Sequence, residues 1–533
     1  MTAAADLVLT NAEGHTLADP DETAAAVAVR DGRVVAVGSR FEVGHRVGVE
    51  TEVVDCEGRV VLPGFVDAHT HLPMVGRRLV EADLGAAESP AEAVERLADR
   101  AAETSGESDR EWILGFGYDE SEWSDERYLT RDDLDAVSDE RPVAAVREDM
   151  HLASLNGVAL DRLRDEMPAE DVQTDGDAGA TSDPTGVVVE DALEVVWEAI
   201  EPDREQMAEF VRAAQARANE LGVVGVHDMV RRSHAPAVYR DLDAAGESTL
   251  RVRINYWADH LDAVRELGLQ TNHGSEMVRV GAIKTFTDGS IGGRTAKVSE
   301  PYADVPDDES TDDGDDESDS DDRGQWVVDP SELRDIVGRA EEADLQVAAH
   351  AIGDEAVAAA LDAFERGDGE RHRIEHAEVL TDDLIDRLAA SSVVVSAQPN
   401  FLKWAREGGL YASRLGDERR LASNRFGALL EAGVPLAFGS DCMPLDPLFG
   451  IEQAVTAPGD EQRLSVTDAL RAYTSGAAYA GFDEARLGTV EPGKLADLVV
   501  LEESPWAVDP GDIGDIEVTR TVVGGETVFE RGD

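Results

Sequence analysis

Short runs of alternating apolar and polar residues mark both ends of the chain. Residues 25–39 (AAVAVRDGRVVAVGS) alternate as a strand pair does, and Asp31-Gly32 at their centre is a typical two-residue hairpin turn. Residues 517–533 show the same character. We therefore expect the two ends to share one small composite β-sandwich, formed by residues 1–60 and 486–533.

Between these ends, apolar runs alternate with amphipathic helical patterns. Residues 89–103 begin with Ser89 as a helix N-cap and Pro90 in the first turn, and residues 329–343 repeat this design. Strand and helix alternation over such a length predicts an α/β domain with a parallel sheet. A (β/α)₈ TIM-type barrel with insertions over residues 61–485 fits the length, and a doubly wound sheet is the rival.

Two segments interrupt the barrel pattern. Residues 164–186 are rich in Asp, Gly and Thr, and residues 304–324 (DVPDDESTDDGDDESDSDDRG) are rich in Asp, Glu and Ser. The acidic segment contains too few apolar residues to offset its ordering entropy, so we expect a disordered insertion. Cation binding is an alternative role for it.

The charge of the chain is strongly negative, with 113 Asp and Glu against 48 Lys and Arg and a formal net charge of -65. Only four residues are lysine, namely Lys284, Lys297, Lys403 and Lys494. This composition resembles that of proteins from salt-loving archaea, whose acidic surfaces stay hydrated in concentrated salt. Nucleic acid is excluded as an expected partner, since phosphate backbones repel such a surface.

Features that would place the chain outside the cytoplasm are missing from the sequence. The first ten residues carry no basic start, and no stretch approaches the roughly 18 apolar residues of a membrane span. The two cysteines, Cys56 and Cys442, cannot form a disulfide framework. We expect a cytoplasmic protein without a membrane partner.

The first candidate for chemistry is the run VVLPGFVDAHTHL at residues 60–72. His69 and His71 are two positions apart, and alternation along a strand puts both on one face, where they can bind one Zn²⁺-like ion. A chance His-x-His on a half-exposed strand is the alternative for this motif alone.

Four more polar residues close apolar, strand-like runs: Lys284, His350, His376 and Asp441. One such residue is more often a satisfied core group than a functional one. Several together are different, because catalytic side chains of α/β barrels lie at the carboxyl ends of the strands.

This order of HxH, Lys, His, His and Asp resembles the amidohydrolase superfamily over the whole chain. More narrowly, the chain resembles the amidohydrolase-3 group, which includes N-substituted formamide deformylases. The motifs that carry this resemblance are KTFTDGSIGGRTA at 284–296, HAIGDEAV at 350–357, HRIEHAE at 372–378 and QPNF at 398–401.

The resemblance implies a ligand set. His69 and His71 would bind one divalent metal ion, most simply Zn²⁺, and His350 and His376 a second. Lys284, carboxylated on its amine, would bridge the two ions, and Asp441 would ligate metal. A site with one ion, in which Lys284 pairs with an acidic neighbour, stays open, although two ions per chain fit the resemblance better.

The implied activity is hydrolysis of a carbon-nitrogen bond in a small non-peptide amide, such as an N-substituted formamide. Metal-activated water would attack, with Asp441 as general base and then general acid. A deaminase or an ester or phosphoester hydrolase is the alternative, and a catalytically silent metal-binding scaffold is the second. We expect a small-molecule amide as the partner, and a homodimer is left open.

Family likeness also implies pocket residues, on weaker signals: Tyr118, Trp123, His151 and Gln398. For each aromatic, packing in a hydrophobic core is an equal alternative, and His151 and His227 divide evenly between pocket and interior. Cys442 lies beside Asp441, but no triad pattern accompanies it, so we interpret it as a small buried thiol.

Overall fold

The computed structural model of the chain describes residues 3–104, 111–120, 123–125, 127–148, 150, 152–175, 183–305, 321–367 and 369–532. His151 and residues 306–320 of the acidic segment lie outside these ranges. The chain divides into two compact units, one formed by Met1–Leu72 with Gln215–Asp533 and the other by Pro73–Ala214.

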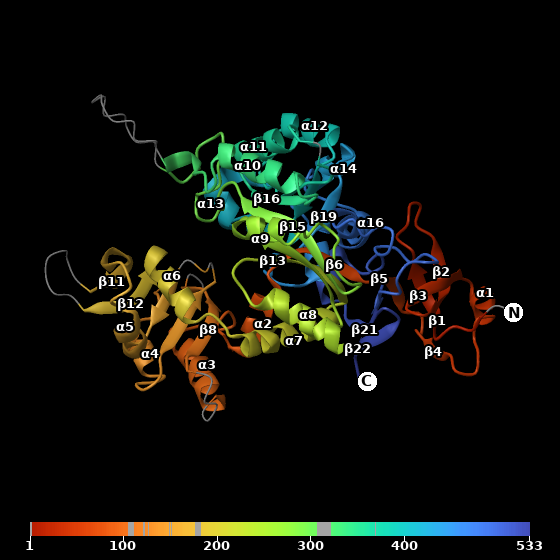
Figure 1. Cartoon of the computed structure of the whole chain (residues 1–533), viewed down its shortest axis with the longest axis horizontal. Helices are drawn as coiled ribbons and strands as arrows, with labels where there is room; N and C mark the ends of the chain where they lie inside the picture. The colour runs from red at the N-terminus through yellow and green to blue at the C-terminus, as the bar shows by residue number, and fades with distance from the viewer. Residues whose placement is uncertain are drawn as a thin grey trace. The chain divides into compact units, whose positions relative to one another are not determined.

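The centre of the first unit is an eight-stranded parallel sheet, and the predicted TIM-type barrel is confirmed (Figure 1). Its first and last strands approach each other, so that it is nearly closed. In spatial order the strands are β6 (Phe65–Thr70), β13 (Val223–Val230), β14 (Arg251–Trp257), β15 (Val278–Phe286), β16 (Val347–Ala351), β17 (Arg373–His376), β18 (Val394–Ala397) and β19 (Leu436–Phe438).

Backbone and carboxylate contacts join the first and last strands. The amide of Asp441 donates to the carbonyl of His69 at 2.7 Å, and the buried carboxylate of Asp67 accepts from the amides of His69 and Ser440. Gly439 permits this approach, because an ideal Cβ there would lie 2.3 Å from the His69 nitrogen. The segment after β19 is thus held against the end of β6.

Helices follow the barrel strands, and α10, α11 and α12 lie on its outer side in Figure 1. The N-cap predicted at residue 329 is present, since the Asp329 carboxylate accepts from the amide of Ser331. The helices of this unit are α1 (Arg40–Gly44), α8 (Ala235–Ala245), α9 (Leu261–Glu266), α10 (Pro330–Glu341), α11 (Asp354–Phe364), α12 (Asp382–Ala390), α13 (Leu410–Leu421), α14 (Phe426–Glu431), α15 (Pro447–Val455), α16 (Val466–Arg471) and α17 (Ala477–Ala480).

Both chain ends contribute to a second eight-stranded sheet of the first unit. Its path is β22 (Glu526–Glu530), β21 (Val518–Val523), β20 (Leu498–Leu501), β5 (Val60–Pro63), β1 (Leu7–His15), β2 (Thr23–Arg30) and β3 (Arg33–Gly38), with β4 (Glu52–Asp55) paired to β1. The central contact is the antiparallel pairing of β5 with β20, which joins segments more than 400 residues apart. Only Gly64 separates β5 from the barrel strand β6, so this sheet directly anchors the strand that carries the HxH motif.

The second unit has a sheet of its own, which the sequence patterns did not distinguish from the barrel. Six strands lie in the order β11 (Val172–Thr174), β12 (Pro184–Val189), β10 (Leu152–Leu155), β9 (Val143–Arg147), β8 (Ile113–Tyr118) and β7 (Ala82–Asp83). The helices are α3 (Pro90–Glu103), α4 (Arg131–Asp135), α5 (Gly157–Leu163) and α6 (Glu190–Ala199), while α2 (Leu72–Val80) and α7 (Arg204–Glu220) span its boundaries. The predicted N-cap Ser89 accepts from the amide of Glu92.

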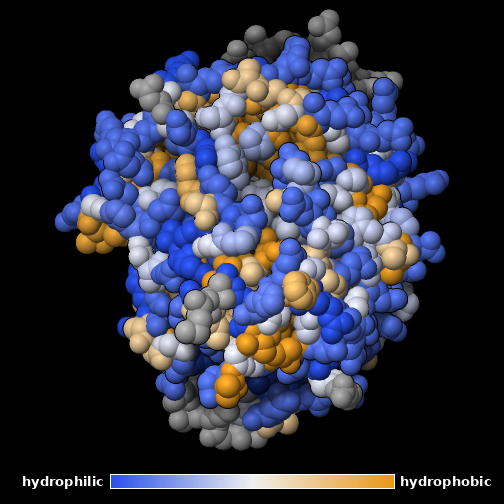
Figure 2. Space-filling model, turned by 90° about the vertical axis from the view of Figure 1, so that its right-hand side faces the viewer, coloured by the Kyte–Doolittle hydropathy of each residue, from blue (hydrophilic) through white to orange (hydrophobic). Residues whose placement is uncertain are grey.

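Hydrophilic residues predominate on the face seen in Figure 2, where hydrophobic residues form separate small patches. Across the described part of the chain, no helix is both long and apolar enough to cross a bilayer.

Candidate metal centre

Three of the predicted ligands meet where the last barrel strand approaches the first. His69 is in β6, His71 follows that strand, and Asp441 lies in the segment after β19. Asp441 Oδ1 is 3.3 Å from His71 Nε2 and 3.7 Å from His69 Nε2. One donor atom from each side chain lies within 4.8 Å of the others, which is close enough for a single ion to contact all three.

Two further histidines extend this group along the barrel. The ring of His376, at the end of β17, is 4.9 Å from the ring of His69 between centroids. The ring of His350, in β16, is 4.5 Å from that of His376 and stacks on Phe286 at 4.4 Å. The barrel therefore brings four histidines into one continuous cluster at the carboxyl ends of its strands, as barrel enzymes arrange their catalytic side chains.

The hydrogen bonds of His69 and His350 leave one ring nitrogen of each for a ligand. His69 Nδ1 lies 2.6 Å from a carboxylate oxygen of Glu375, to which it can only donate, and His350 Nε2 lies 2.9 Å from the carbonyl of Gly289. Because the proton is used in these bonds, His69 Nε2 and His350 Nδ1 carry lone pairs. Metal-binding histidines are oriented in the same way, through their second nitrogen.

Burial keeps these imidazoles neutral. It lowers the pKa of His69, of His350 and of His376 well below the ordinary value, and the charge of Lys284 acts in the same direction on each. Neutral imidazole is the form that ligates a cation.

Asp441 and His71 favour their charged forms instead. Burial alone would raise the pKa of Asp441, but the hydrogen bond and charge of His71 and the charge of Lys284 outweigh it, and the pKa is lowered. Burial alone would lower the pKa of His71, but the hydrogen bond and charge of Asp441 raise it. Asp441 is therefore an ionised carboxylate at the centre of the cluster.

Lys284 lies near the carboxyl end of β15 and is 1% exposed. Burial lowers its pKa to about 8, although the charges of Glu375 and Asp441 oppose this shift. Among the described residues, its Nζ is one of the buried polar atoms without a hydrogen-bond partner, as is Nδ1 of His376. Buried donors are rarely left in this way unless a ligand completes them.

Backbone strain accompanies two of the candidate ligands. His376 has a φ of 74° and Asp441 a φ of 51°, in the left-handed region that residues other than glycine seldom adopt. Such conformations cost roughly 1–3 kcal/mol each and concentrate at functional sites. His376 ends β17 and Asp441 lies three positions after the end of β19, so the strain sets the direction of their side chains.

A chain of buried polar groups supports the cluster from inside the barrel. Arg373 contacts both carboxylate oxygens of Glu375, at 2.8 and 3.0 Å, and Glu375 in turn orients His69. Arg373 also donates to Nδ1 of His227 at 2.8 Å and to the carbonyl of Ala68 at 2.6 Å. Arg373 and Glu375 are fully buried, so their ion pair is sensitive to the loss of either partner.

The four residues predicted to line the substrate pocket belong to different units of the chain. Tyr118 and Trp123 lie in the hydrophobic core of the second unit, where Tyr118 Oη is 3.1 Å from Ser154 Oγ and Trp123 Nε1 donates to the carbonyl of Ala87. Gln398 is buried beside His376. His151 lies outside the described residues, and a substrate-binding role for these four stays a prediction.

Sequence reasoning missed the supporting residues Glu375, Arg373 and Asp67. A signal for the first two was present: RIEH forms a fully buried strand in which two opposite charges lie two positions apart, on the same face. Buried charges are normally paired, so this spacing indicates a buried ion pair next to a ligand. Asp67 offers no such local signal, because its partner Ser440 is 373 residues away.

Comparison with known proteins adds to this geometry. A family model described as "Amidohydrolase family" matches residues 52–529, which is most of the chain. The chain belongs to the amidohydrolase family. It is accordingly an enzyme of the hydrolase class, and the resemblance inferred from its motifs is confirmed.

Relatives cover this amidohydrolase almost from end to end. It is 30% identical to the YtcJ protein of Bacillus subtilis (strain 168), over 97% of this chain and 98% of that protein. It is 26% identical to the N-substituted formamide deformylase of Arthrobacter pascens, over 100% and 99%. A solved structure of an uncharacterized metal-dependent hydrolase from Pyrococcus furiosus shares 31% identity and superposes with a TM-score of 0.78, covering 94% of this chain and 99% of that one.

Proposed function

We propose that this amidohydrolase uses a divalent metal centre to hydrolyse a carbon-nitrogen bond in a small non-peptide amide. The observation that carries the proposal is the convergence of His69, His71 and Asp441, whose donor atoms lie within 4.8 Å of one another. The similar Pyrococcus furiosus protein, a metal-dependent hydrolase, supports the same reading. Zn²⁺ is the ion we propose first, because imidazole and carboxylate are among its preferred ligands.

The residues present fit a metal centre. The neutral imidazoles of His69, His350 and His376 offer lone pairs, and Asp441 offers an ionised carboxylate. Two buried nitrogens, of Lys284 and His376, have no partner among the described residues. We propose that His69, His71 and Asp441 hold one ion, with His71 releasing its proton as the ion binds, and that His350 and His376 hold a second.

Lys284 is suited to bridge the two ions after carboxylation. Only a neutral amine reacts with CO₂ to form a carbamate, and burial brings the pKa of Lys284 down to about 8, so that a neutral fraction exists near neutral pH. The reaction forms a nitrogen–carbon bond and releases one proton. The resulting anion has two oxygens in place of an ammonium group that would repel a cation.

Asp441 is the group proposed to move protons during the reaction. When bound, a divalent ion supplies Lewis acidity, which lowers the pKa of water toward about 7 and polarises the substrate carbonyl. Asp441 is ionised and 16% exposed, so it can accept a proton from the attacking water. The same carboxyl then delivers this proton to the leaving nitrogen, which yields a carboxylic acid and an amine.

The substrate class comes from similarity. The Arthrobacter pascens relative is an N-substituted formamide deformylase and aligns with this chain over its full length. We therefore propose N-substituted formamides as the first class to assay. The products would be formate and a primary amine.

The direct test compares three substrate classes on metal-stripped and Zn²⁺-reconstituted protein. N-substituted formamides, the matching N-acetyl amines and the matching formate esters share their organic group. The first two differ in the acyl group on the nitrogen, and the esters have a C–O bond in place of the C–N bond. We expect reconstituted protein to release formate and amine from the formamides faster than it hydrolyses the other two, and stripped protein to be inactive.

Faster hydrolysis of the esters would contradict the amide assignment while leaving the metal-dependent mechanism intact. Activity that survives complete metal removal would contradict the mechanism itself. Zinc binding without hydrolysis of any substrate in the panel would overturn the formamide assignment.

A further inference from the structure

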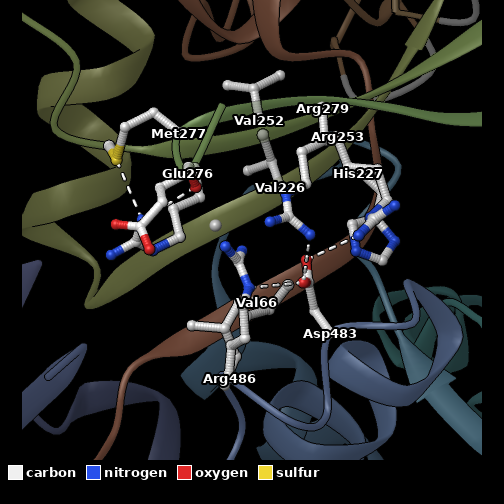
Figure 3. A pocket seen from close by; sticks show the side chains of 13 residues that line it. Val66, Val226, His227, Val252, Arg253, Glu276, Met277, Arg279, Asp483 and Arg486 are labelled. Carbon is white, nitrogen blue, oxygen red and sulfur yellow. Dashed lines mark hydrogen bonds and ion pairs between the residues drawn. The ribbon is translucent and has the colours of Figure 1, made fainter. Parts of the chain in front are cut away.

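A second polar cluster lies at the opposite end of the barrel. The pocket in Figure 3 is lined by the first residues of β14 and by residues around the start of β15, together with parts of β6 and β13 and the segment 483–487. Its cavity volume is about 20 Å³, which is room for a water or one small ion. The metal-centre candidates, by contrast, are at the carboxyl ends of the same strands.

Positive charge is in excess in this pocket. Four guanidinium groups line it, those of Arg251, Arg253, Arg279 and Arg486, against the carboxylates of Glu276 and Asp483. Asp497 neutralises Arg251, so three guanidinium groups remain against two carboxylates, an excess of one positive charge. This is unusual in a chain whose formal net charge is -65.

Three of the arginines share one carboxylate. Arg253, Arg279 and Arg486 contact Asp483 at 2.7, 3.2 and 3.0 Å, and Figure 3 shows them converging on it. Arg251 does not compete for this carboxylate, because it makes a bidentate pair with Asp497. A single carboxylate cannot neutralise three guanidinium groups, although Arg253 also donates to Asn272 and Arg279 to the carbonyl of Ser275.

One buried donor in the described part of this cluster also lacks an acceptor, and a second donor faces the same space. Among the described residues, Nε of Arg253 has no hydrogen-bond partner, although the side chain is only 4% exposed. His227 accepts from Arg373 through Nδ1, so a neutral ring carries its proton on Nε2. An ideal Cβ on Gly481 would lie 2.7 Å from the first nitrogen and 2.9 Å from the second, so any other residue there would block both donors.

The pKa shifts in the pocket agree with an excess of positive charge. Burial lowers the pKa of Arg253 and of Arg279, the charge of Asp483 opposes it, and neighbouring guanidinium groups lower both further. A negative ion would relieve this crowding. Water, which carries no charge, would not.

We propose that this pocket binds a small inorganic anion of the size of chloride. The anion would accept hydrogen bonds from the guanidinium groups of Arg279 and Arg486, on the side away from Asp483. It would thereby link β15 to the segment that follows α17. A bound anion stabilises the folded protein in proportion to its occupancy. The site is independent of the proposed reaction, since it lies at the other end of the barrel.

Chlorine-35 NMR tests the proposal on the full chain. A chloride ion that exchanges with a protein site broadens the resonance of free chloride, and a competing anion removes this broadening. We expect excess line width with the wild-type protein and loss of most of it in the Arg279→Gln/Arg486→Gln variant. Arg339→Gln/Arg387→Gln is the matched control, because it removes two arginines that pair with acidic residues on helices outside the pocket.

Equal broadening by both variants would overturn the proposal, since the chloride would then bind elsewhere on the surface. The second measurement needs no variant: crystals of the wild-type protein grown in bromide should give an anomalous peak beside Arg279 and Arg486. Absence of this peak at saturating bromide would also overturn the proposal, as would phosphate, rather than halide, in the pocket of crystals grown with both.

Discussion

The two ends of one barrel present opposite chemistry. At the carboxyl ends of the strands, burial keeps His69 neutral while Asp441 is ionised, so the cluster offers lone pairs and negative charge. At the amino ends, Arg253 and Arg279 share Asp483 with a third guanidinium, so the cluster offers N–H donors and positive charge. One end is thus suited to a cation and the other to an anion.

This difference shows that burial alone does not determine the character of a polar site. Both clusters are largely buried, yet the side chains that face the cavity decide which ion each can hold. The strand β15 contributes to both, with Arg279 at its start and Lys284 near its end. Lys284 is five positions after Arg279, which corresponds to roughly 17 Å along an extended strand.

The largest effect should come from the carboxylate at the centre of the carboxyl-end cluster. Asp441→Asn keeps the shape of the side chain but removes the carboxylate that we propose as the base. We expect turnover of the best formamide substrate to fall by about 10²- to 10⁴-fold, the usual contribution of general acid–base catalysis. Steady-state kinetics at saturating metal measures this loss.

Asp446→Asn is the matched control, five residues further along the same segment. Asp446 caps α15 by accepting from the amides of Leu448 and Phe449 and is outside the ligand group. Asn caps helices about as well as Asp, so this replacement should leave both stability and turnover nearly unchanged. Similar losses of turnover in both variants would show that Asp441 has only a structural role.

The next effect concerns the carboxylate that orients His69. In Glu375→Gln the charge facing Arg373 disappears, and the hydrogen bond to His69 Nδ1 becomes weaker. Loss of such a supporting partner typically lowers metal affinity by about 10- to 100-fold. Competition with a chelator of known affinity measures the change.

Ser396→Ala separates metal positioning from general stability. It removes another hydrogen-bond partner of Arg373, at 2.9 Å, but leaves the contact between Glu375 and His69. We expect a stability loss of about 1 kcal/mol and unchanged metal affinity. An unchanged affinity in Glu375→Gln as well would contradict the proposed role of Glu375.

A smaller, pH-dependent effect should come from Lys284 in metal-free, CO₂-free protein. Burial lowers its pKa from the ordinary 10.5 to about 8, so between these values the unfolded chain binds more protons than the folded one. The free energy of unfolding should therefore rise with pH across this window. Chemical denaturation at several pH values should show the rise in wild type and in Lys297→Met, but not in Lys284→Met.

The smallest expected effect is the absence of coupling between the two ends. The Arg279→Gln/Arg486→Gln variant should lose chloride-dependent line broadening and keep its metal content, because neither replaced residue contacts a ligand candidate and distant substitutions behave additively. Elemental analysis of this variant checks the point. A loss of metal would show that the buried chain through His227, Arg373 and Glu375 transmits changes from the amino end.

Local patterns predicted an α/β domain with a parallel sheet and several of its elements, but they left a doubly wound sheet open as a rival to the barrel. Alternation in residues 25–39 predicted the β2–β3 hairpin, and Ser89 and Asp329 cap the helices that their positions indicated. The separate unit at Pro73–Ala214 was not predicted. Its strands and helices alternate as those of the barrel do, and sequence periodicity does not reveal which strands pair.

The candidate site was predictable to the extent that its residues end apolar runs. His69, His350 and His376 do so and lie together in the barrel. Tertiary partners such as Asp67 with Ser440 could not be inferred, because no local pattern relates residues so far apart. The arginine pocket escaped notice for the same reason, since Arg253, Arg279 and Asp483 meet only in the folded chain.

Metal content per chain tests the central claim most directly. Elemental analysis of wild-type protein reconstituted with Zn²⁺ and dialysed should give about two ions per chain, as in other two-metal hydrolytic sites. The His69→Gln/His71→Gln variant should bind fewer, while the Arg339→Gln/Arg387→Gln control should match wild type. A wild-type protein that retains no metal, or a His69→Gln/His71→Gln variant that retains as much as wild type, would contradict a metal centre at this end of the barrel.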